Sequence, residues 1–277
     1  MIDWLTDPFA LHFQQRALLG GSFVAITLSV VGTWVVIRGM SFLGDALVHG
    51  IIPGIAAAIL LDFNVLLGAV VSAFIMVAGI ELVRKQTAFS EDTSIGLLFV
   101  GMLGLGVIMI SRTSGYTGSI TQILFGDVLG VSNSDVLGSA ATALIVIIAS
   151  VFLYRPFLVM AFSEQKSRLL GLQPKLAHLV MLGLITLSII GSFQTVGTIL
   201  ALGFIVGPPA TATLLVRRVP MIMATAALIG VISVFIGLVV SFHADTSGSA
   251  TMAVVPIVMF FIVLTVRSIM DSRLHIP

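Results

Sequence analysis

The chain contains 277 residues, of which 58% are hydrophobic and only 9% are charged. Soluble domains are about 45–50% apolar and about 25% charged, so this composition indicates an integral membrane protein. The formal net charge of +1 excludes a basic surface for nucleic acid. The absence of cysteine excludes disulfides, thiolate metal ligands and cysteine nucleophiles.

Several apolar runs approach the roughly 20 residues that an α-helix needs to cross a bilayer. They predict an all-α integral membrane protein with about nine transmembrane helices, in one domain that covers residues 1–277. Glycine and proline interrupt the second run, and the sixth and seventh runs are nearly continuous. The predicted spans are 18–37, 42–61, 64–83, 94–111, 135–154, 176–195, 196–216, 220–241 and 250–267.

The basic residues predict the orientation, because short loops rich in Lys and Arg stay in the cytoplasm. With the C-terminus inside, eleven of the thirteen basic residues lie in cytoplasmic segments, and only Arg16 and Arg112 lie outside. An odd number of spans then places the N-terminus outside.

Two segments between the predicted spans are informative. Residues 163–175, SEQKSRLLGLQPK, begin with a serine suited to cap a helix and contain Gly171 and Pro174, which would end it. We expect a short cytoplasmic helix there. Residues 118–132 are too short to span and lie on the outer side, which predicts a half-helix that re-enters the bundle with Asp127 near its centre.

One predicted span carries an aspartate and a histidine, in the stretch GDALVHGIIPG of residues 44–54. An aspartate in the bilayer core costs roughly 2.5–3.5 kcal/mol, so Asp45 is expected to face a partner or a cavity. His49 follows one helical turn later, on the same face. Pro53 should interrupt the helix directly after the pair. Spacing alone leaves three readings: a buried hydrogen bond, a site for Mn(II), Fe(II) or Zn(II), and a proton relay.

The other polar residues in or near the spans have simpler explanations. His243 and Asp245 lie at the outer end of the eighth span, where a hydrated loop or a first contact site for a cation would explain them. Glu81 lies within a turn of Arg84, which indicates an ion pair at the membrane edge. His178 has no partner at a meaningful spacing. Pro208–Pro209 predict a break or kink in the seventh span.

An enzymatic function is not indicated. The chain has no Gly-Lys pair, so it lacks the GxxxxGK[ST] phosphate loop and cannot bind ATP in that manner. It also has no HExxH or GxSxG motif.

Motifs along nearly the whole chain resemble the membrane permease subunits of bacterial ATP-binding-cassette importers for manganese, zinc and iron. Two of them are specific, VVIRGMSFLGDALVHGIIPGIA (35–56) and ITQILFGDVLGVSNSD (120–135). The others are SEDTSIGLLFVGMLGLGVIMIS (90–111), LLGL (169–172), GTILALGFIVGPPATATLL (197–215) and SFHADTSGSAT (241–251).

The resemblance implies a fold similar to that of the vitamin B12 and siderophore permeases, one helix shorter at the N-terminus. It implies a homo- or heterodimer in the bacterial cell membrane. Two cytoplasmic nucleotide-binding subunits and an extracytoplasmic metal-binding protein would complete the importer. ATP hydrolysis would belong to the separate subunits, so this chain would carry no catalytic residue and no resident cofactor. The metal, Mn(II), Zn(II) or Fe(II), would be the cargo.

The resemblance also assigns roles to residues. The metal-pathway aspartate and histidine of these permeases map onto Asp45 and His49. The coupling helix, which docks onto the nucleotide-binding subunit, maps onto residues 163–172, with Glu164, Lys166, Arg168, Leu170 and Gly171 as the contact residues. The wording IIPG at residues 51–54 favours the manganese and iron members. The chain departs from its relatives at Val48, at Gly50 and at His243-Ala244-Asp245, and the last departure leaves a cation-loading role for His243 without support from the resemblance. The rival hypothesis is a proton-coupled secondary transporter that uses Asp45 and His49 as a relay.

Overall fold

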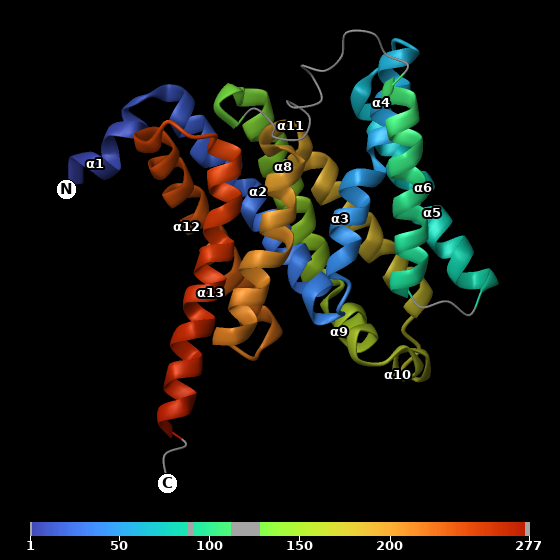
Figure 1. Ribbon diagram of the computed structural model, residues 1–277. Helices are drawn as coiled ribbons and strands as arrows, with labels where there is room; N and C mark the ends of the chain where they lie inside the picture. Colours follow the sequence, from blue (N-terminus) through green and yellow to red (C-terminus); the bar gives the residue numbers. More distant parts are fainter. Residues whose placement is uncertain (1, 88–90, 112–127, 275–277) are drawn as a thin grey trace.

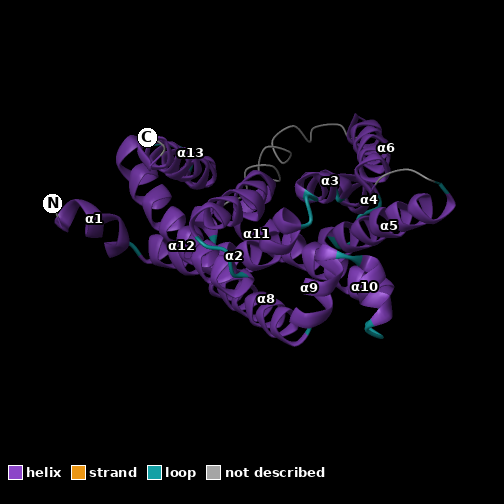
Figure 2. Cartoon of the chain, turned by 90° about the horizontal axis from the view of Figure 1, so that it is seen from below, coloured by secondary structure: helices purple, strands orange, loops and turns teal. Residues whose placement is uncertain are grey.

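The computed structural model describes residues 2–87, 91–111 and 128–274. Across these ranges the chain consists of helices joined by short turns, without any strand (Figure 2). Eight helical segments are long and apolar enough to cross a membrane, and Leu200–Leu215 is a shorter apolar helix. The predicted all-α architecture with about nine crossings is confirmed. The helices are α1 (Ile2–Thr6), α2 (His12–Ile37), α3 (Ser41–Gly50), α4 (Ile52–Leu60), α5 (Val65–Gln86), α6 (Glu91–Ser111), α8 (Asn133–Phe152), α9 (Tyr154–Phe162), α10 (Glu164–Leu169), α11 (Pro174–Leu215), α12 (Val219–Ala244) and α13 (Gly248–Leu274).

The long helix α11 lies at the centre of the arrangement. On one side it contacts α3 and α5, which form a group with α4 and α6 (Figure 2). On the other side it contacts α2, α12 and α13, and α12 contacts both α2 and α13. Figure 1 shows α9, α10 and the C-terminal end of α13 at the lower end of the molecule, which we call the α10 end. Helices α9, α10 and α13 bring five basic residues to this end, Arg155, Lys166, Arg168, Arg267 and Arg273, and their gathering at one end is what the predicted orientation requires.

The second predicted span is divided into α3 and α4 at Ile51. The division has a local cause, since Pro53 has no N–H to give to the carbonyl of His49, four residues earlier. The carbonyl of Gly50, at the end of α3, accepts a buried hydrogen bond of 2.7 Å from Ser72 Oγ of α5. The interruption predicted from the sequence therefore exists. A side chain from the neighbouring helix provides a hydrogen bond to one backbone carbonyl that the interruption leaves without a partner in its own helix.

Helix α11 contains the sixth and seventh predicted spans, and its one non-helical residue is Gly197, with φ 74° and ψ 174°. This backbone conformation favours glycine. Beyond it, Gly203 lies against Ala253 and Gly207 against Pro256, so the second half of α11 runs parallel to α13. The helix continues through Pro208–Pro209. The predicted break between the two spans therefore occurs at Gly197, while the two prolines stay within a regular helix.

Close helix packing depends on glycine at two crossings. A Cβ added to Gly32 of α2 would fall on the carbonyl oxygen of Ile205 in α11. A Cβ added to Gly54 of α4 would fall on the carbonyl oxygen of Gly68 in α5, and a Cβ added to Gly68 would fall on the carbonyl oxygen of Gly54. Small residues allow such contact where lipid supplies no hydrophobic driving force. The second crossing holds α4 against α5.

Candidate functional site

Asp45 and His49 lie one turn apart on α3, on a face of the helix that is partly exposed. His49 Nε2 is 3.4 Å from Asp45 Oδ1, and the two side chains are 27% and 35% exposed, respectively. The side chains between them, Ala46, Leu47 and Val48, are buried. Because the buried face holds α3 against the bundle, the carboxylate and the imidazole are held together on the accessible face. The sequence predicted this proximity.

Aromatic side chains of α3 and α6 hold the imidazole ring in place. Phe99 of α6 meets the His49 ring edge-on, with centroids 5.7 Å apart, and Phe42 of α3 packs on Phe99 at 5.3 Å. His49 Nδ1 is buried and has no hydrogen-bond partner among the described residues. The ring is thus packed on its apolar side, while Nε2 points to the carboxylate of Asp45.

The pair can share a proton or contribute two ligands to a cation. Neutral imidazole nitrogen and carboxylate oxygen suit Mn(II), Fe(II) and Zn(II). Within the described ranges no group of three or more His, Cys, Asp or Glu side chains could hold a metal ion. The pair alone would leave a bound ion short of ligands, since these metals bind four to six.

Helix α10 occupies the short segment predicted to be helical. Ser163 caps it, with its Oγ accepting from the Lys166 amide at 3.2 Å, and Gly171 follows it with φ 69°. Glu164 is its first residue and Leu170 its C-cap. Two neighbouring leucines, Leu169 and Leu170, are 87% and 57% exposed. Lys166 and Arg168 are exposed as well, so the segment offers a surface that is both basic and apolar.

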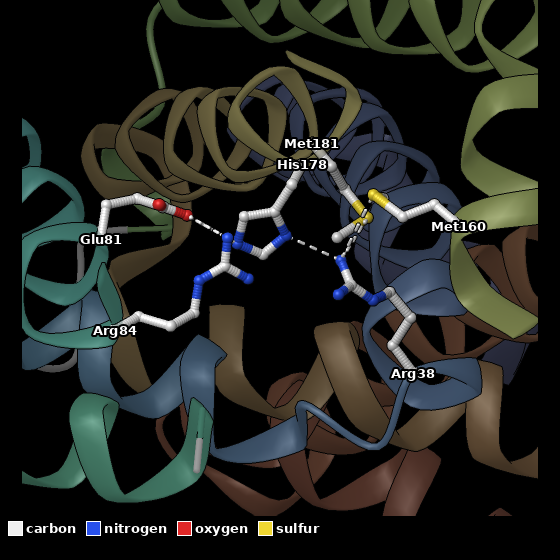
Figure 3. A network of polar contacts seen from close by, with 6 residues as sticks. All are labelled: Arg38, Glu81, Arg84, Met160, His178 and Met181. Atoms are coloured by element: carbon white, nitrogen blue, oxygen red, sulfur yellow. Dashed lines mark hydrogen bonds and ion pairs between the residues drawn. The ribbon is translucent and has the colours of Figure 1, made fainter. Parts of the chain in front are cut away.

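Four charged or ionisable side chains form a further polar cluster at the α10 end (Figure 3). His178 of α11 lies between Arg38, which follows α2, and Glu81 of α5. The Arg38 Nη1 to His178 Nδ1 distance is 2.9 Å, and His178 Nε2 lies 3.2 Å from Glu81 Oε1. Arg84 Nη2 is 3.0 Å from the same carboxylate oxygen. We call these four residues the His178 cluster.

The profile of the ABC 3 transport family matches residues 10–267, which is most of the chain. The chain belongs to the ABC 3 transport family. Members are the permease subunits of ATP-binding-cassette transporters, so this protein is a transport component, and ATP hydrolysis belongs to a separate subunit.

Named relatives of this permease match nearly full length. It is 34% identical over 250 residues to the "Manganese transport system membrane protein MntC" of Listeria monocytogenes, covering 90% of this chain and 89% of the relative. It is 27% identical over 277 residues to the "Chelated iron transport system membrane protein YfeD" of Yersinia pestis, covering 99% and 93%. Among solved structures it resembles "PsaBC from Streptococcus pneumoniae in complex with Fab", with a TM-score of 0.83, 26% identity and 95% of each chain covered. These likenesses support the predicted permease fold.

Two of the remaining predicted site residues of this permease, His243 and Asp245, lie at the end of α12. His243 Nε2 lies 2.8 Å from the Trp4 carbonyl oxygen, and its ring stacks on Trp4 at 4.3 Å, so it holds α1 to the end of α12. Asp245 is the C-cap of α12, with φ 49°. Asp127 and most of the predicted half-helix lie outside the described residues, of which Val128–Gly130 form a short 3-10 helix.

Sequence reasoning missed the His178 cluster. It identified the Glu81–Arg84 pair from its spacing but found no partner for His178, because Arg38 is 140 residues away in sequence. The available signal was the histidine itself, since an ionisable residue in a span is by default a candidate functional residue. His178 is 3% exposed.

Proposed function

We propose that this permease is the membrane subunit of an importer that moves a divalent transition-metal ion, preferably Mn(II), into the bacterial cytoplasm. The observation that carries the proposal is the Asp45–His49 pair, held on an accessible face of α3 directly before the helix interruption. Relatives named for manganese and for chelated iron support a metal cargo. Zn(II) and Fe(II) fit the same ligands.

An incomplete site is suited to transport. A cargo ion must bind strongly enough to enter and weakly enough to leave, so two ligands from one chain are an advantage. A second permease protomer, identical or homologous, would supply the same pair across a two-fold axis and give two carboxylates and two imidazoles. The soft Cu(I) ion prefers thiolate and thioether ligands and would be disfavoured.

Helix α10 is the proposed contact with the ATPase subunits. Exposed Leu169 and Leu170 would insert into an apolar groove of a nucleotide-binding subunit, with Lys166 and Arg168 at the rim. Glu164 and Gly171 would set the ends of this coupling helix. The complete importer would contain two permease protomers, two cytoplasmic nucleotide-binding subunits and an extracytoplasmic metal-binding protein. A cation-loading role for Asp127, His243 or Asp245 stays a prediction.

Metal uptake by the assembled importer in metal-depleted cells tests the proposal. Asp45→Asn removes the charge and keeps the shape, and His49→Ala removes the nitrogen ligand, so each should abolish uptake while assembly with the nucleotide-binding subunits persists. Matched controls are Asp62→Asn, in the turn after α4, and His12→Ala, in the first turn of α2; both should transport normally. Normal transport by Asp45→Asn would disprove the site.

The choice of metal needs a competition experiment. Zn(II) binds most nitrogen and oxygen sites more tightly than Mn(II), so selectivity for manganese must come from geometry, from the delivery protein and from metal availability. We expect Mn(II) accumulation when both metals are offered to the intact importer. Accumulation of zinc alone would show that the metal assignment is wrong.

The rival proton-coupled mechanism makes a different prediction. In proteoliposomes that contain the importer and ATP, uptake should continue when a protonophore collapses the proton gradient and should stop when ATP is omitted. Uptake that follows the gradient and ignores ATP would favour the proton relay.

A further inference from the structure

The His178 cluster joins three helices that are far apart in the sequence. Arg38 belongs to the end of α2, Glu81 and Arg84 to the last turns of α5, and His178 to the start of α11 (Figure 3). His178 and Glu81 are 3% and 7% exposed. Arg38 Nη1 also lies 4.0 Å from the sulfur of Met160 in α9 and 3.9 Å from that of Met181 in α11. The centre of the cluster, His178 and Glu81, is therefore shielded from solvent, the two arginines are half-buried, and Arg38 touches α9 as well.

The hydrogen bond from Arg38 determines which nitrogen of the His178 imidazole carries the hydrogen. A guanidinium can only donate, so Nδ1 of His178 accepts from Arg38. In the neutral ring the hydrogen is then on Nε2, which faces the carboxylate of Glu81 at 3.2 Å. Nδ1 is occupied by Arg38, Nε2 faces Glu81, and the guanidinium groups of Arg38 and Arg84 would repel a cation. The cluster is thus unsuited to be a second binding site for the cargo.

The chain connects this cluster to both proposed functional elements. Only Gly39 and Met40 separate Arg38 from α3, which carries Asp45 and His49. The linker is short and fixed, since the Met40 amide donates to the Val35 carbonyl at 2.9 Å.

On the other side, α11 begins at Pro174, a few residues after α10. The intervening segment is also fixed, because the Leu172 amide donates to the Ser167 carbonyl of α10 at 3.0 Å and Ser167 is fully buried. A displacement of α10 would therefore move the first two turns of α11, which include His178.

We propose that the His178 cluster transmits the movement of α10 to α3, and so sets the geometry of the Asp45–His49 pair according to the state of the ATPase subunits. The inference rests on the proposed function. Its physical basis is the cost of pulling polar partners away from the buried His178 and Glu81, because a polar or charged group left behind would be buried without compensation. Arg38, Glu81 and His178 should therefore move as one unit, and the ends of α2, α5 and α11 with them.

A reporter on α3 tests whether α3 follows the movement of α10. Because the chain has no cysteine, a single introduced cysteine is the one labelling site of this subunit. Ser41→Cys, at the exposed first residue of α3, would be labelled with a maleimide in the assembled importer, without nucleotide and with trapped ATP. We expect labelling rates in the two states that differ severalfold. No difference would overturn the proposal, because α3 would then not respond to the ATPase subunits.

Variants at His178 then decide whether the cluster carries the movement. His178→Phe keeps a ring and removes both polar contacts, so the difference between the two states should disappear. His178→Gln can still accept and donate, and should restore most of it. Met181→Leu, which changes an apolar neighbour of Arg38 at similar volume, should leave it intact. If His178→Phe does not assemble, Glu81→Gln replaces it with the same expected loss.

The outcomes separate this proposal from the function itself. If the labelling rates of His178→Phe, or of Glu81→Gln, still differ between the two states as in the parent, the proposal is overturned. It is also overturned if His178→Phe, His178→Gln and Met181→Leu lose this difference equally, because that would indicate a general loosening of the packing. Labelling requires no metal, so uptake by Asp45→Asn tests the function independently. Normal uptake by Asp45→Asn together with loss of the difference in His178→Phe would reject the metal site and retain the link.

Discussion

Replacement of Gly54 by alanine should destabilise the permease, because α4 and α5 touch through their backbones at this position. The new Cβ would fall on the carbonyl oxygen of Gly68 and within 2.5 Å of Ser72 Cβ. Backbone atoms cannot rotate away, so the two helices must separate. Overpacking of this kind costs about 1–3 kcal/mol of unfolding free energy. A protein of this size loses about 2–4 °C in melting temperature per kcal/mol.

The matched control is Gly104→Ala in α6, where an added Cβ meets no atom within 4 Å. It should be neutral or stabilising, by up to about 1 kcal/mol, because alanine favours the helix more than glycine does. Thermal unfolding of both variants in detergent, followed by fluorescence, measures the difference. If Gly54→Ala melts at the temperature of the parent, the close approach of α4 and α5 is wrong.

Three other predictions concern the ends of the helices. Arg168→Glu or Leu170→Pro should uncouple ATP hydrolysis from uptake while the protein stays inserted. ATPase and uptake assays on the same preparation measure this coupling. Unchanged coupling in both variants would show that α10 only connects α9 to α11. A reporter fused at Lys166 should give a cytoplasmic signal, and a periplasmic signal would invert the topology. His243→Ala should release Trp4 and α1, so that protease cleaves the N-terminal segment several times faster than in the parent, with equal rates contradicting the contact.

The features that could be predicted from sequence are those with a local cause. Apolar run length gave the crossings, Pro53 gave the interruption of the second span, and Ser163 with Gly171 gave the short helix α10. The proximity of Asp45 and His49 also follows from spacing, since residues four apart share a helix face.

The remaining features depend on contacts between distant segments. His178 acquires its partners only when α2, α5 and α11 pack together, so no local pattern could reveal the cluster. The break within α11 occurs at Gly197, one of many glycines in the predicted spans, while the Pro208–Pro209 pair gave the stronger but misleading signal. A proline pair can be accommodated when packed neighbours satisfy the freed backbone groups.

The second half of α11 has a consequence for biogenesis. At ~1.5 Å per residue, residues 198–215, which follow Gly197, reach about 27 Å, a little less than the roughly 30 Å of a hydrocarbon core. Its side chains Leu200, Phe204 and Ile205 are buried against other helices, so lipid hardly touches it. Such a segment gains little free energy when it moves from the translocon into lipid without its neighbouring helices. It should be retained there until α12 and α13 have been synthesised, and a nascent chain truncated before α12 should expose it to quality-control proteases.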